Sequence, residues 1–250
     1  MIEVKHVNKS FDDKQVLFDI SVLFHESINN LIIGQSGSGK TVLMKCLLGL
    51  LTPDSGQILF DERNFVGASQ SMLHEVRKDA STVFQNSALF DSMSVLQNVI
   101  FPLDMFTNQS YAEKVERAVD CLKQVGLENV EKKMPAELSG GMRKRVAIAR
   151  AIANRPKYFF CDEPNSGLDP YTSSLIDDLI AELTYRHKMT TVVNTHDMNS
   201  VLKMGDRITF VHKGHIAWQG TSKEILYSGC DELVEFLESS ELTKRLVGRV

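Results

Sequence analysis

The stretch that decides the fold of this chain reads Gly34-Gln35-Ser36-Gly37-Ser38-Gly39-Lys40-Thr41. It matches the pattern G-x-x-x-x-G-K-[ST] of phosphate-binding P-loops. Its surroundings also suit such a loop, because residues 28–33 end in an apolar Leu-Ile-Ile run that predicts a buried strand, and a helix is predicted to open at Lys40. The sequence therefore predicts a strand, a phosphate-binding turn and a helix in succession.

The residue types in this stretch suit a nucleoside triphosphate with its metal ion. The glycines let consecutive backbone N–H groups curl around phosphate oxygens, and the start of the helix adds its partial positive charge. Lys40 would meet the β- and γ-phosphates, and the hydroxyl of Thr41 would ligate Mg²⁺. An ordinary glycine turn before a helix is the alternative, which the preceding strand and following helix disfavour. We therefore expect ATP and Mg²⁺ at residues 34–41.

A pair of carboxylates follows another apolar run. Residues 158–161 read Tyr-Phe-Phe-Cys and predict a short buried strand, and Asp162 and Glu163 stand at its end. In a P-loop protein, Asp162 would hold Mg²⁺ through water, and Glu163 would accept a proton from the water that attacks the γ-phosphate. Carboxylates commonly end strands, so this assignment depends on the P-loop upstream.

The order of the remaining patterns predicts an α/β fold. Capping-box spacing joins Ser110 to Glu113 at the start of a helical pattern, and Gly126 is a reasonable stop for that helix. Strand-like runs lie at 2–7, 16–24, 28–33, 158–161 and 190–193, helical periodicity at 111–125 and 175–183, and a hairpin pattern at 208–218. Strands that alternate with helices predict a largely parallel sheet, with antiparallel strands towards both ends of the chain. A helical lobe is expected to interrupt this sheet between about residues 85 and 156.

Composition and charge exclude several classes of protein. The chain has 250 residues, of which 43% are hydrophobic and 24% charged, so it can bury a core and is not disordered as a whole. A net charge of −4 and a pI near 6.0 argue against a general basic surface for nucleic acid. No apolar run approaches the roughly 18 residues of a membrane-spanning helix. The N-terminus also lacks a secretory pattern, so we expect a chain that is neither exported nor inserted in a membrane.

The cysteines and one histidine pair offer little sign of a metal centre. Cys46, Cys121, Cys161 and Cys230 lie far apart and form no C-x-x-C spacing. His212 and His215 flank Lys213-Gly214 inside alternating apolar residues. We therefore expect reduced thiols, and a hairpin turn in place of a metal site.

A second glycine-containing helix start indicates the class of P-loop protein. Residues 138–142 read Leu-Ser-Gly-Gly-Met and precede a basic helix. Ser139 and the amides of Gly140 and Gly141 would form a second anion cradle, whereas a capped and solvated basic face is the alternative. Here the chain resembles the ABC-type ATPases, whose signature reads L-S-G-G-Q; Met142 departs from that pattern.

The resemblance implies a homodimer that encloses two ATP molecules. In that family Ser139, Gly140 and Gly141 would close on the γ-phosphate of ATP held by the other subunit. Asp169, in the loop at 166–169, matches the contact with that subunit.

Four further positions match nucleotide-contacting residues of the family. Gln85 matches the glutamine that senses Mg²⁺ and the attacking water, and His196 matches the switch histidine at the γ-phosphate. Phe11, with Val16 nearby, matches the aromatic position that stacks on adenine, although an ordinary core phenylalanine is the alternative there.

The resemblance also implies the domain organisation. The fold class is α/β, with a P-loop (RecA-like), mostly parallel sheet core, an antiparallel β subdomain and an inserted α-helical subdomain. One ATPase domain would cover residues 1–250. Its core and β subdomain are expected at 1–84 and 157–230, its helical lobe with the signature at 85–156, and a short C-terminal helix at 231–250.

Details at residues 87–103, 135–145 and 162–170 resemble the ATPases of Mla/MCE-type phospholipid transporters. This implies ATP-driven phospholipid transport in a bacterial envelope, serving outer-membrane lipid asymmetry. The implied partners are integral-membrane permease subunits and an MCE-type lipid-binding protein, with the ATPase peripheral on the cytoplasmic face of the inner membrane. An ATPase of a polar-solute importer, such as one for amino acids, is the alternative. An ABC ATPase acting on nucleic acid is a third, which the lack of a coiled coil, zinc module or fused second ATPase disfavours.

Overall fold

The computed structural model describes residues 1–12 and 14–238. The chain separates into two compact units, which we call unit 1, Met1–Val76 with Thr190–Val250, and unit 2, Arg77–Met189. Helix α2, Gln70–Asp79, spans the join between them. The division expected from the sequence, with a lobe at 85–156 inside a core at 1–84 and 157–230, stays a prediction.

Unit 1 contains an antiparallel sheet with the order β2-β1-β4-β5. The bounds of its strands are Ile2–Phe11 for β1, Lys14–Phe24 for β2, Ser55–Phe60 for β4 and Arg63–Asn64 for β5. Apolar side chains of this sheet, such as Ile2, Leu17 and Phe60, are buried and form part of the hydrophobic core.

Unit 1 also contains the strand that leads into the P-loop. Strand β3, Asn29–Ile33, is buried at every position and pairs in parallel with β8, Thr190–Asn194, and with β9, Arg207–His212. Strand β10, His215–Gly220, returns antiparallel to β9 across Lys213-Gly214, as the hairpin pattern predicted. The helices of this unit are α1 at Lys40–Leu47, α7 at Met198–Met204 and α8 at Asp231–Glu238.

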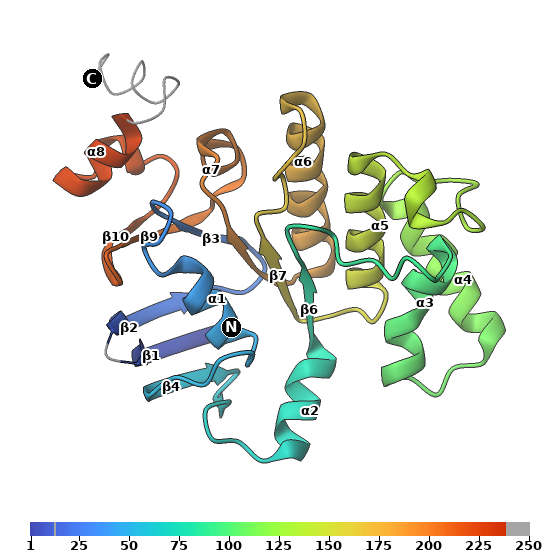
Figure 1. Ribbon diagram of the computed structural model, residues 1–250, viewed down its shortest axis with the longest axis horizontal. Coiled ribbons are helices and arrows are strands. Elements are labelled where there is room, and N and C mark those ends of the chain that lie inside the picture. The colour runs from blue at the N-terminus through green and yellow to red at the C-terminus, as the bar shows by residue number, and fades with distance from the viewer. Residues whose placement is uncertain (13, 239–250) are drawn as a thin grey trace. The chain divides into compact units, whose positions relative to one another are not determined.

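Unit 2 combines a parallel strand pair with most of the helices. Strand β6, Ala80–Val83, pairs with β7, Tyr158–Asp162. The long helices are α3 at Val95–Phe106, α4 at Tyr111–Gln124, α5 at Gly140–Ile152 and α6 at Pro170–His187. Helix α5 lies between α6 and the α3–α4 pair and contacts all three, which makes it the central helix of this unit (Figure 1).

The secondary structure confirms the mixed α/β pattern and also extends it. Helix α4 begins at the predicted capping box, in which Ser110 N–H donates to Glu113 Oε2 at 2.7 Å. Helices α2 and α3 were not predicted. Helix α3 contains Pro102, and a proline in the sequence normally indicates that no helix continues through it. Of the predicted C-terminal helix at 231–250, α8 covers the first part, and 239–250 lie outside the described residues. Among the described helices, none is long and apolar enough to cross a membrane.

Candidate active site

The P-loop joins β3 to α1 and is pressed against its neighbours. Gly34 has φ of 148°, and a Cβ there would lie 2.2 Å from the carbonyl oxygen of Val211 in β9. Gly39 has φ of 108°, and a Cβ there would lie 2.9 Å from Leu17 Cδ2. Since other residues rarely adopt these angles and no side chain fits, both positions require glycine.

The loop is built to receive an anion. Lys40 is 7% exposed, and its Nζ donates to the carbonyl oxygens of Gly34 at 2.8 Å and Gln35 at 2.9 Å. The hydroxyl of Ser38 is buried and lacks a hydrogen-bond partner among the described residues. A buried polar group of this kind normally has a partner, and phosphate oxygens would supply one. The residues of the loop therefore fit a nucleoside triphosphate, with the hydroxyl of Thr41 at the start of α1 available to its Mg²⁺.

The β9–β10 turn supports the P-loop from outside. The N–H of Gly214 donates to the carbonyl oxygen of Ser38 at 2.9 Å, and the N–H of Phe18 donates to the carbonyl oxygen of Gly214 at 2.9 Å. The H-x-x-H sequence at 212–215 thus belongs to a turn that braces the phosphate loop, and the hairpin interpretation is confirmed.

Unit 1 places His196 at the same sheet edge as the P-loop. Strands β3 and β8 are parallel, with Ile32 opposite Asn194, so the segments that follow them leave at a shared edge. His196 is exposed just beyond β8, where Thr195 N–H donates to the carbonyl oxygen of Ile32 at 3.2 Å. This arrangement suits a switch residue near the phosphates.

The residues expected to contact adenine also lie in unit 1. A Cβ at Gly39 would lie 3.2 Å from the carbonyl oxygen of Val16, so Val16 adjoins the P-loop. Phe11 ends β1 with a side chain 42% exposed, and the ammonium of Lys9 lies 5.5 Å from its ring centroid. Phe11 is therefore no ordinary core phenylalanine, and its stacking on adenine stays a prediction.

Unit 2 brings Gln85 and the carboxylates to one sheet edge. Strands β6 and β7 are parallel, with Val83 opposite Cys161. Gln85 therefore follows the carboxyl end of β6, and Asp162 and Glu163 lie at the carboxyl end of β7 beside it. Glu163 has φ of 49°, a left-handed conformation that costs a non-glycine residue about 1–3 kcal/mol. Such strain is maintained at sites where the direction of a side chain matters.

The signature segment forms the start of helix α5, as predicted, and its role as an anion cradle stays a prediction. The hydroxyl of Ser139 accepts from Met142 N–H at 3.2 Å and so caps α5. A Cβ at Gly140 would lie 3.5 Å from Leu168 Cδ2, whereas one at Gly141 would lie only 2.7 Å from Thr172 Cγ2. Helix α5 therefore starts in close contact with the loop before α6 and with the first turn of α6.

The loop at 166–169 is ordered by its own hydrogen bonds. Asp169 caps α6 by accepting from Thr172 N–H at 3.0 Å, and the hydrogen bonds from Thr172 lower the pKa of its carboxyl. Gln85 Nε2 donates to Ser166 Oγ at 2.8 Å. The structure thus joins Gln85, the loop at 166–169 and the signature helix within unit 2.

The sequence analysis missed two cations on α5, of which Lys144 is buried and Arg150 half-buried. Lys144 is 3% exposed and donates to the carbonyl oxygen of Gln85, and desolvation lowers the pKa of its ammonium. Arg150 donates to the carbonyl oxygens of Ser87 at 2.9 Å and Ala88 at 2.7 Å. The alternative of a solvated basic face is therefore wrong for Lys144. The available signal was that Lys144 stands one turn before the apolar Ile148, on the buried face of α5.

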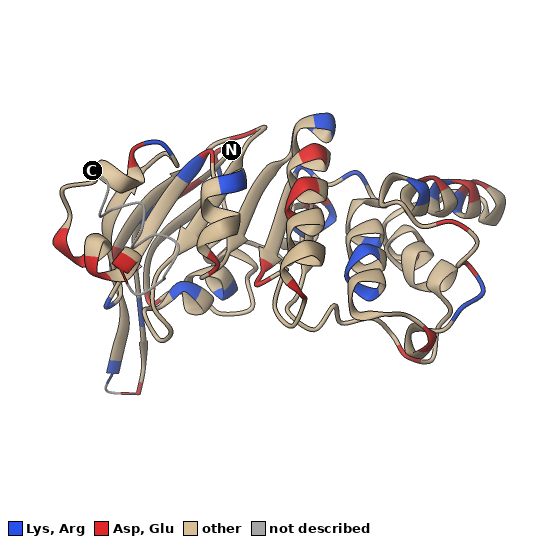
Figure 2. Ribbon diagram, turned by 90° about the horizontal axis from the view of Figure 1, so that it is seen from above, with Lys and Arg blue, Asp and Glu red and all other residues tan. Residues whose placement is uncertain are grey.

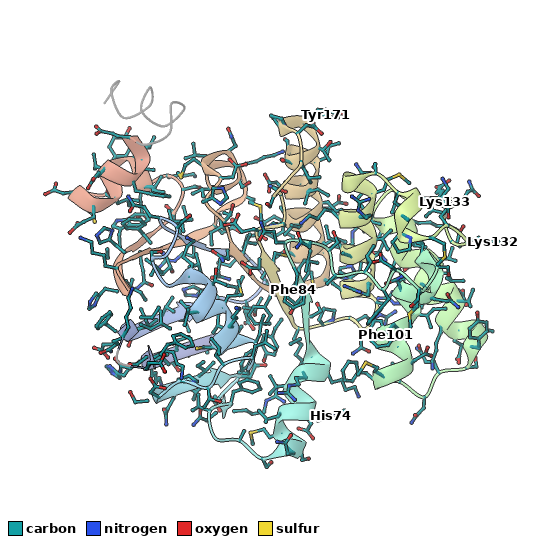
Figure 3. The ribbon with its side chains drawn as sticks, viewed as in Figure 1. His74, Phe84, Phe101, Lys132, Lys133 and Tyr171 are labelled. Atoms are coloured by element: carbon teal, nitrogen blue, oxygen red, sulfur yellow. The ribbon has the colours of Figure 1, made fainter. Side chains whose placement is uncertain are left out.

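Unit 2 also carries an apolar groove of about 430 Å³. Phe84 and Phe101, which come from the end of β6 and from α3, belong to its wall (Figure 3). Phe90 and Phe101 have ring centroids 4.7 Å apart, and the Arg150 guanidinium lies 5.9 Å from the Phe90 centroid. The groove is further lined by Ala80, Ser81, Thr82, Ala88, Pro102, Met105, Phe106, Ala151, Asn154 and Pro156.

The strand, glycine turn and helix at 29–47, with Lys40 inside the turn, define a P-loop nucleoside triphosphatase. Residues 17–166 match the family model described as ABC transporter, and the chain belongs to that family. It is an ATP-binding, ATP-hydrolysing subunit of the ABC transporter class, which uses ATP with Mg²⁺. ATPases of this class act as dimers with membrane permeases.

Similar curated proteins carry names with different substrates. The chain is 34% identical over 241 residues to the probable ribonucleotide transport ATP-binding protein mkl of Mycobacterium leprae, covering 96% of this chain and 70% of that protein. It is 37% identical over 243 residues to the methionine import ATP-binding protein MetN of Clostridium tetani, covering 97% and 76%.

Solved structures agree with the fold class. The ATP-binding cassette MJ0796, in a dimeric post-hydrolysis state with ADP and Pi, has a TM-score of 0.81 at 31% identity, covering 89% of this chain and 99% of that one. The protein cbiO1 of Clostridium perfringens, part of an ABC transporter complex, has a TM-score of 0.84 at 29% identity, covering 100% and 98%. The predicted P-loop α/β fold is thereby confirmed.

Proposed function

We propose that this chain powers a membrane transporter by hydrolysing ATP between two copies of itself. The observation that carries the proposal is the P-loop, in which Lys40 is held close to the loop backbone and the buried hydroxyl of Ser38 has no hydrogen-bond partner within the described part of the chain. Lys40 and the amides of residues 34–39 would hold the phosphates. Thr41, Gln85 and Asp162 would hold Mg²⁺, which stabilises the charge that develops on the phosphates.

Within this proposal the remaining site residues divide the chemistry between them. Glu163 accepts the proton of the attacking water, and His196 donates a hydrogen bond to the γ-phosphate. Ser139, Gly140 and Gly141 supply backbone and hydroxyl donors to ATP on the partner copy, and Asp169 contacts that copy. Support for the second cradle comes from the capped and tightly packed start of α5.

The groove in unit 2 is the proposed docking site for the permease. Its aromatic and aliphatic lining, with Phe84 and Phe90 both well exposed, suits the apolar face of a short helix. The ATPase would then sit on the cytoplasmic face of the inner membrane through this contact, with no need for a basic lipid-binding surface. The charge pattern agrees, because acidic and basic residues are interspersed along each unit (Figure 2).

We propose a phospholipid as the transported substrate, moved in a bacterial envelope with the help of an MCE-type lipid-binding protein. The support is the resemblance of residues 87–103, 135–145 and 162–170 to ATPases of that branch. A polar-solute importer is the second candidate, because the MetN protein of Clostridium tetani is 37% identical over nearly the whole chain.

The experiment that separates these substrates is affinity purification of the full-length chain from detergent-solubilised membranes, with partners and lipids identified by mass. A permease with an MCE-type protein and bound phospholipid would support the leading proposal, whereas a permease with a solute-binding protein would replace it. Stimulation of hydrolysis by DNA and not by reconstituted permease would overturn both.

A matched pair of variants tests the groove in the same experiment. Met105 lines the groove and is 58% exposed, so Met105→Glu places a charge in an apolar contact and should lower permease recovery roughly tenfold or more. Tyr111, which is 69% exposed on α4 and lies outside the groove lining, provides the control Tyr111→Glu. Equal recovery with both variants would remove the groove from the proposal.

A further inference from the structure

Residues 85–88 run through unit 2 in a conformation that needs outside support. Ser87 and Ala88 have φ of 62° and 46°, so the chain makes a left-handed turn without glycine. Backbone in this conformation cannot join a regular ladder, and its carbonyl groups require donors from elsewhere.

The donors to the carbonyl groups of Gln85, Ser87 and Ala88 come from a single helix. Lys144 of α5 donates to the carbonyl oxygen of Gln85, and Arg150 of α5 donates to those of Ser87 and Ala88, at 2.9 and 2.7 Å. Both cations are largely withdrawn from water: Lys144 is 3% exposed, and desolvation lowers the pKa of each group. Withdrawing a cation from water costs free energy unless its N–H groups make hydrogen bonds. The hydrogen bonds to the turn therefore offset the cost of burying these two side chains.

The same helix and turn also reach the residues proposed for chemistry. Gln85 extends its side chain to Ser166, with Nε2 donating to Oγ at 2.8 Å. The negative charge of Glu163, just after β7, acts on the ammonium of Lys144 and raises the pKa of that ammonium, against the larger effect of desolvation. Lys144 therefore combines a hydrogen bond to the backbone of Gln85 with an electrostatic interaction with Glu163.

We propose that Lys144 and Arg150 are positioning residues for hydrolysis, which together fix the backbone of residues 85–88 to α5 and so hold the Gln85 side chain in place. Because α5 begins at the signature segment, the same helix sets the position of Gln85 and of the cradle for the partner's ATP. This inference rests on the proposed roles of Gln85 and Glu163. The inference adds that Lys144 and Arg150 would connect α5 to these two residues.

The main test is Lys144→Met in the full-length chain, with Lys123→Met on the exposed surface of α4 as the matched control. Methionine fills a similar volume without leaving a buried charge. We expect kcat for ATP hydrolysis to fall roughly 10- to 100-fold, because small displacements of a positioned group cost that much. The KM for ATP should change less than about twofold, since Lys144 makes no ground-state contact with nucleotide in this scheme.

Two further readouts separate positioning from general structure. Lys144→Arg keeps the charge and the donor and should restore most of the lost rate. In a Gln85→Ala background, Lys144→Met should cause little additional loss, because residues that act through one another are not additive. Full additivity, or an equal fall with Lys123→Met, would overturn the proposal.

Amide hydrogen exchange of residues 85–90 gives a test that needs no hydrolysis. Exchange there should be faster in Lys144→Met and in Arg150→Met, with the rest of unit 2 protected as in the wild type. If Lys144→Met does not fold, Lys144→Gln and Arg150→Met carry the same comparison. Unchanged exchange would overturn the inference. Wild-type hydrolysis by Glu163→Gln would overturn only the proposed base, and the exchange result would then decide whether Lys144 and Arg150 fix residues 85–88.

Discussion

Lys40 is held inside the P-loop by the loop itself. Its ammonium donates to the carbonyl oxygens of Gly34 and Gln35 and is nearly buried, so the side chain is already oriented before nucleotide binds. Such preorganisation lowers the entropy cost of holding the β- and γ-phosphates. The contacts are made by neighbouring backbone, which explains why a local pattern could predict them.

Lys40→Ala should therefore weaken ATP binding roughly 10- to 100-fold, because a hydrogen bond to a charged group contributes about 1.5–3 kcal/mol. Lys45, which is exposed on the same helix, provides the control Lys45→Ala. Equilibrium binding of a fluorescent ATP analogue measures the change. Equal affinity in the two variants would mean that the loop is not the phosphate site.

Site residues that depend on local sequence could be predicted, and those that depend on long-range packing could not. The P-loop and the cap at Ser139 follow from short patterns whose spacing encodes a backbone geometry. The burial of Lys144 and the contact of Gln85 with Ser166 depend on segments that meet only in the fold. A basic residue in an amphipathic helix is most often solvated, and only its helical spacing from Ile148 indicated that Lys144 is buried.

At the scale of elements, the start of α5 is limited by its contact with the start of α6. A Cβ at Gly141 would approach Thr172 Cγ2 to 2.7 Å, which is closer than ordinary van der Waals contact. The corresponding distance at Gly140 is 3.5 Å, to Leu168 Cδ2. The two glycines of the signature thus have different structural roles: Gly141 allows close packing, and Gly140 leaves room for a methyl group.

Gly141→Ala should accordingly lower the free energy of unfolding of the protein by about 1–3 kcal/mol, the usual cost of overpacking. Gly140→Ala should be neutral or slightly stabilising, because alanine is the better helix former. Adding Thr172→Ser to Gly141→Ala removes the clashing methyl and should restore most of the loss. Differential scanning calorimetry of the three variants checks this order, and a Gly141→Ala protein as stable as Gly140→Ala would contradict it.

Elements with strong local signals were predicted well, whereas others were not. Helix α4 has both a capping box at Ser110 and helical periodicity, and it was found with its correct start. Helix α3 contains Pro102 within a largely apolar run, so neither helical periodicity nor the rule that proline breaks helices favoured a helix. Its capping box, in which Ser94 N–H donates to Gln97 Oε1 at 2.8 Å, was the signal that would have revealed it.

At the scale of the whole molecule, the chain contains one P-loop and one signature helix start, in different units. In the proposed function each copy completes its ATP site with the signature of a second copy, so the dimer has two-fold symmetry and contains two equivalent sites. In such a dimer the binding of ATP and the association of the two copies are thermodynamically coupled. Bound ATP would stabilise the dimer, and its hydrolysis would favour separation of the copies.

The linkage predicts that Glu163→Gln forms an ATP-dependent dimer. Glutamine keeps the size of the side chain but cannot accept the proton of water, so hydrolysis should slow roughly 10²- to 10⁴-fold while ATP remains bound. Adding Ser139→Arg places a bulky cation at the start of α5 and should return the protein to a monomer without loss of ATP binding. Glu116→Gln, on the exposed face of α4, is the control for loss of one carboxylate. Light scattering with and without ATP measures the mass, and a Glu163→Gln chain that stays monomeric in saturating ATP would exclude a site shared between copies.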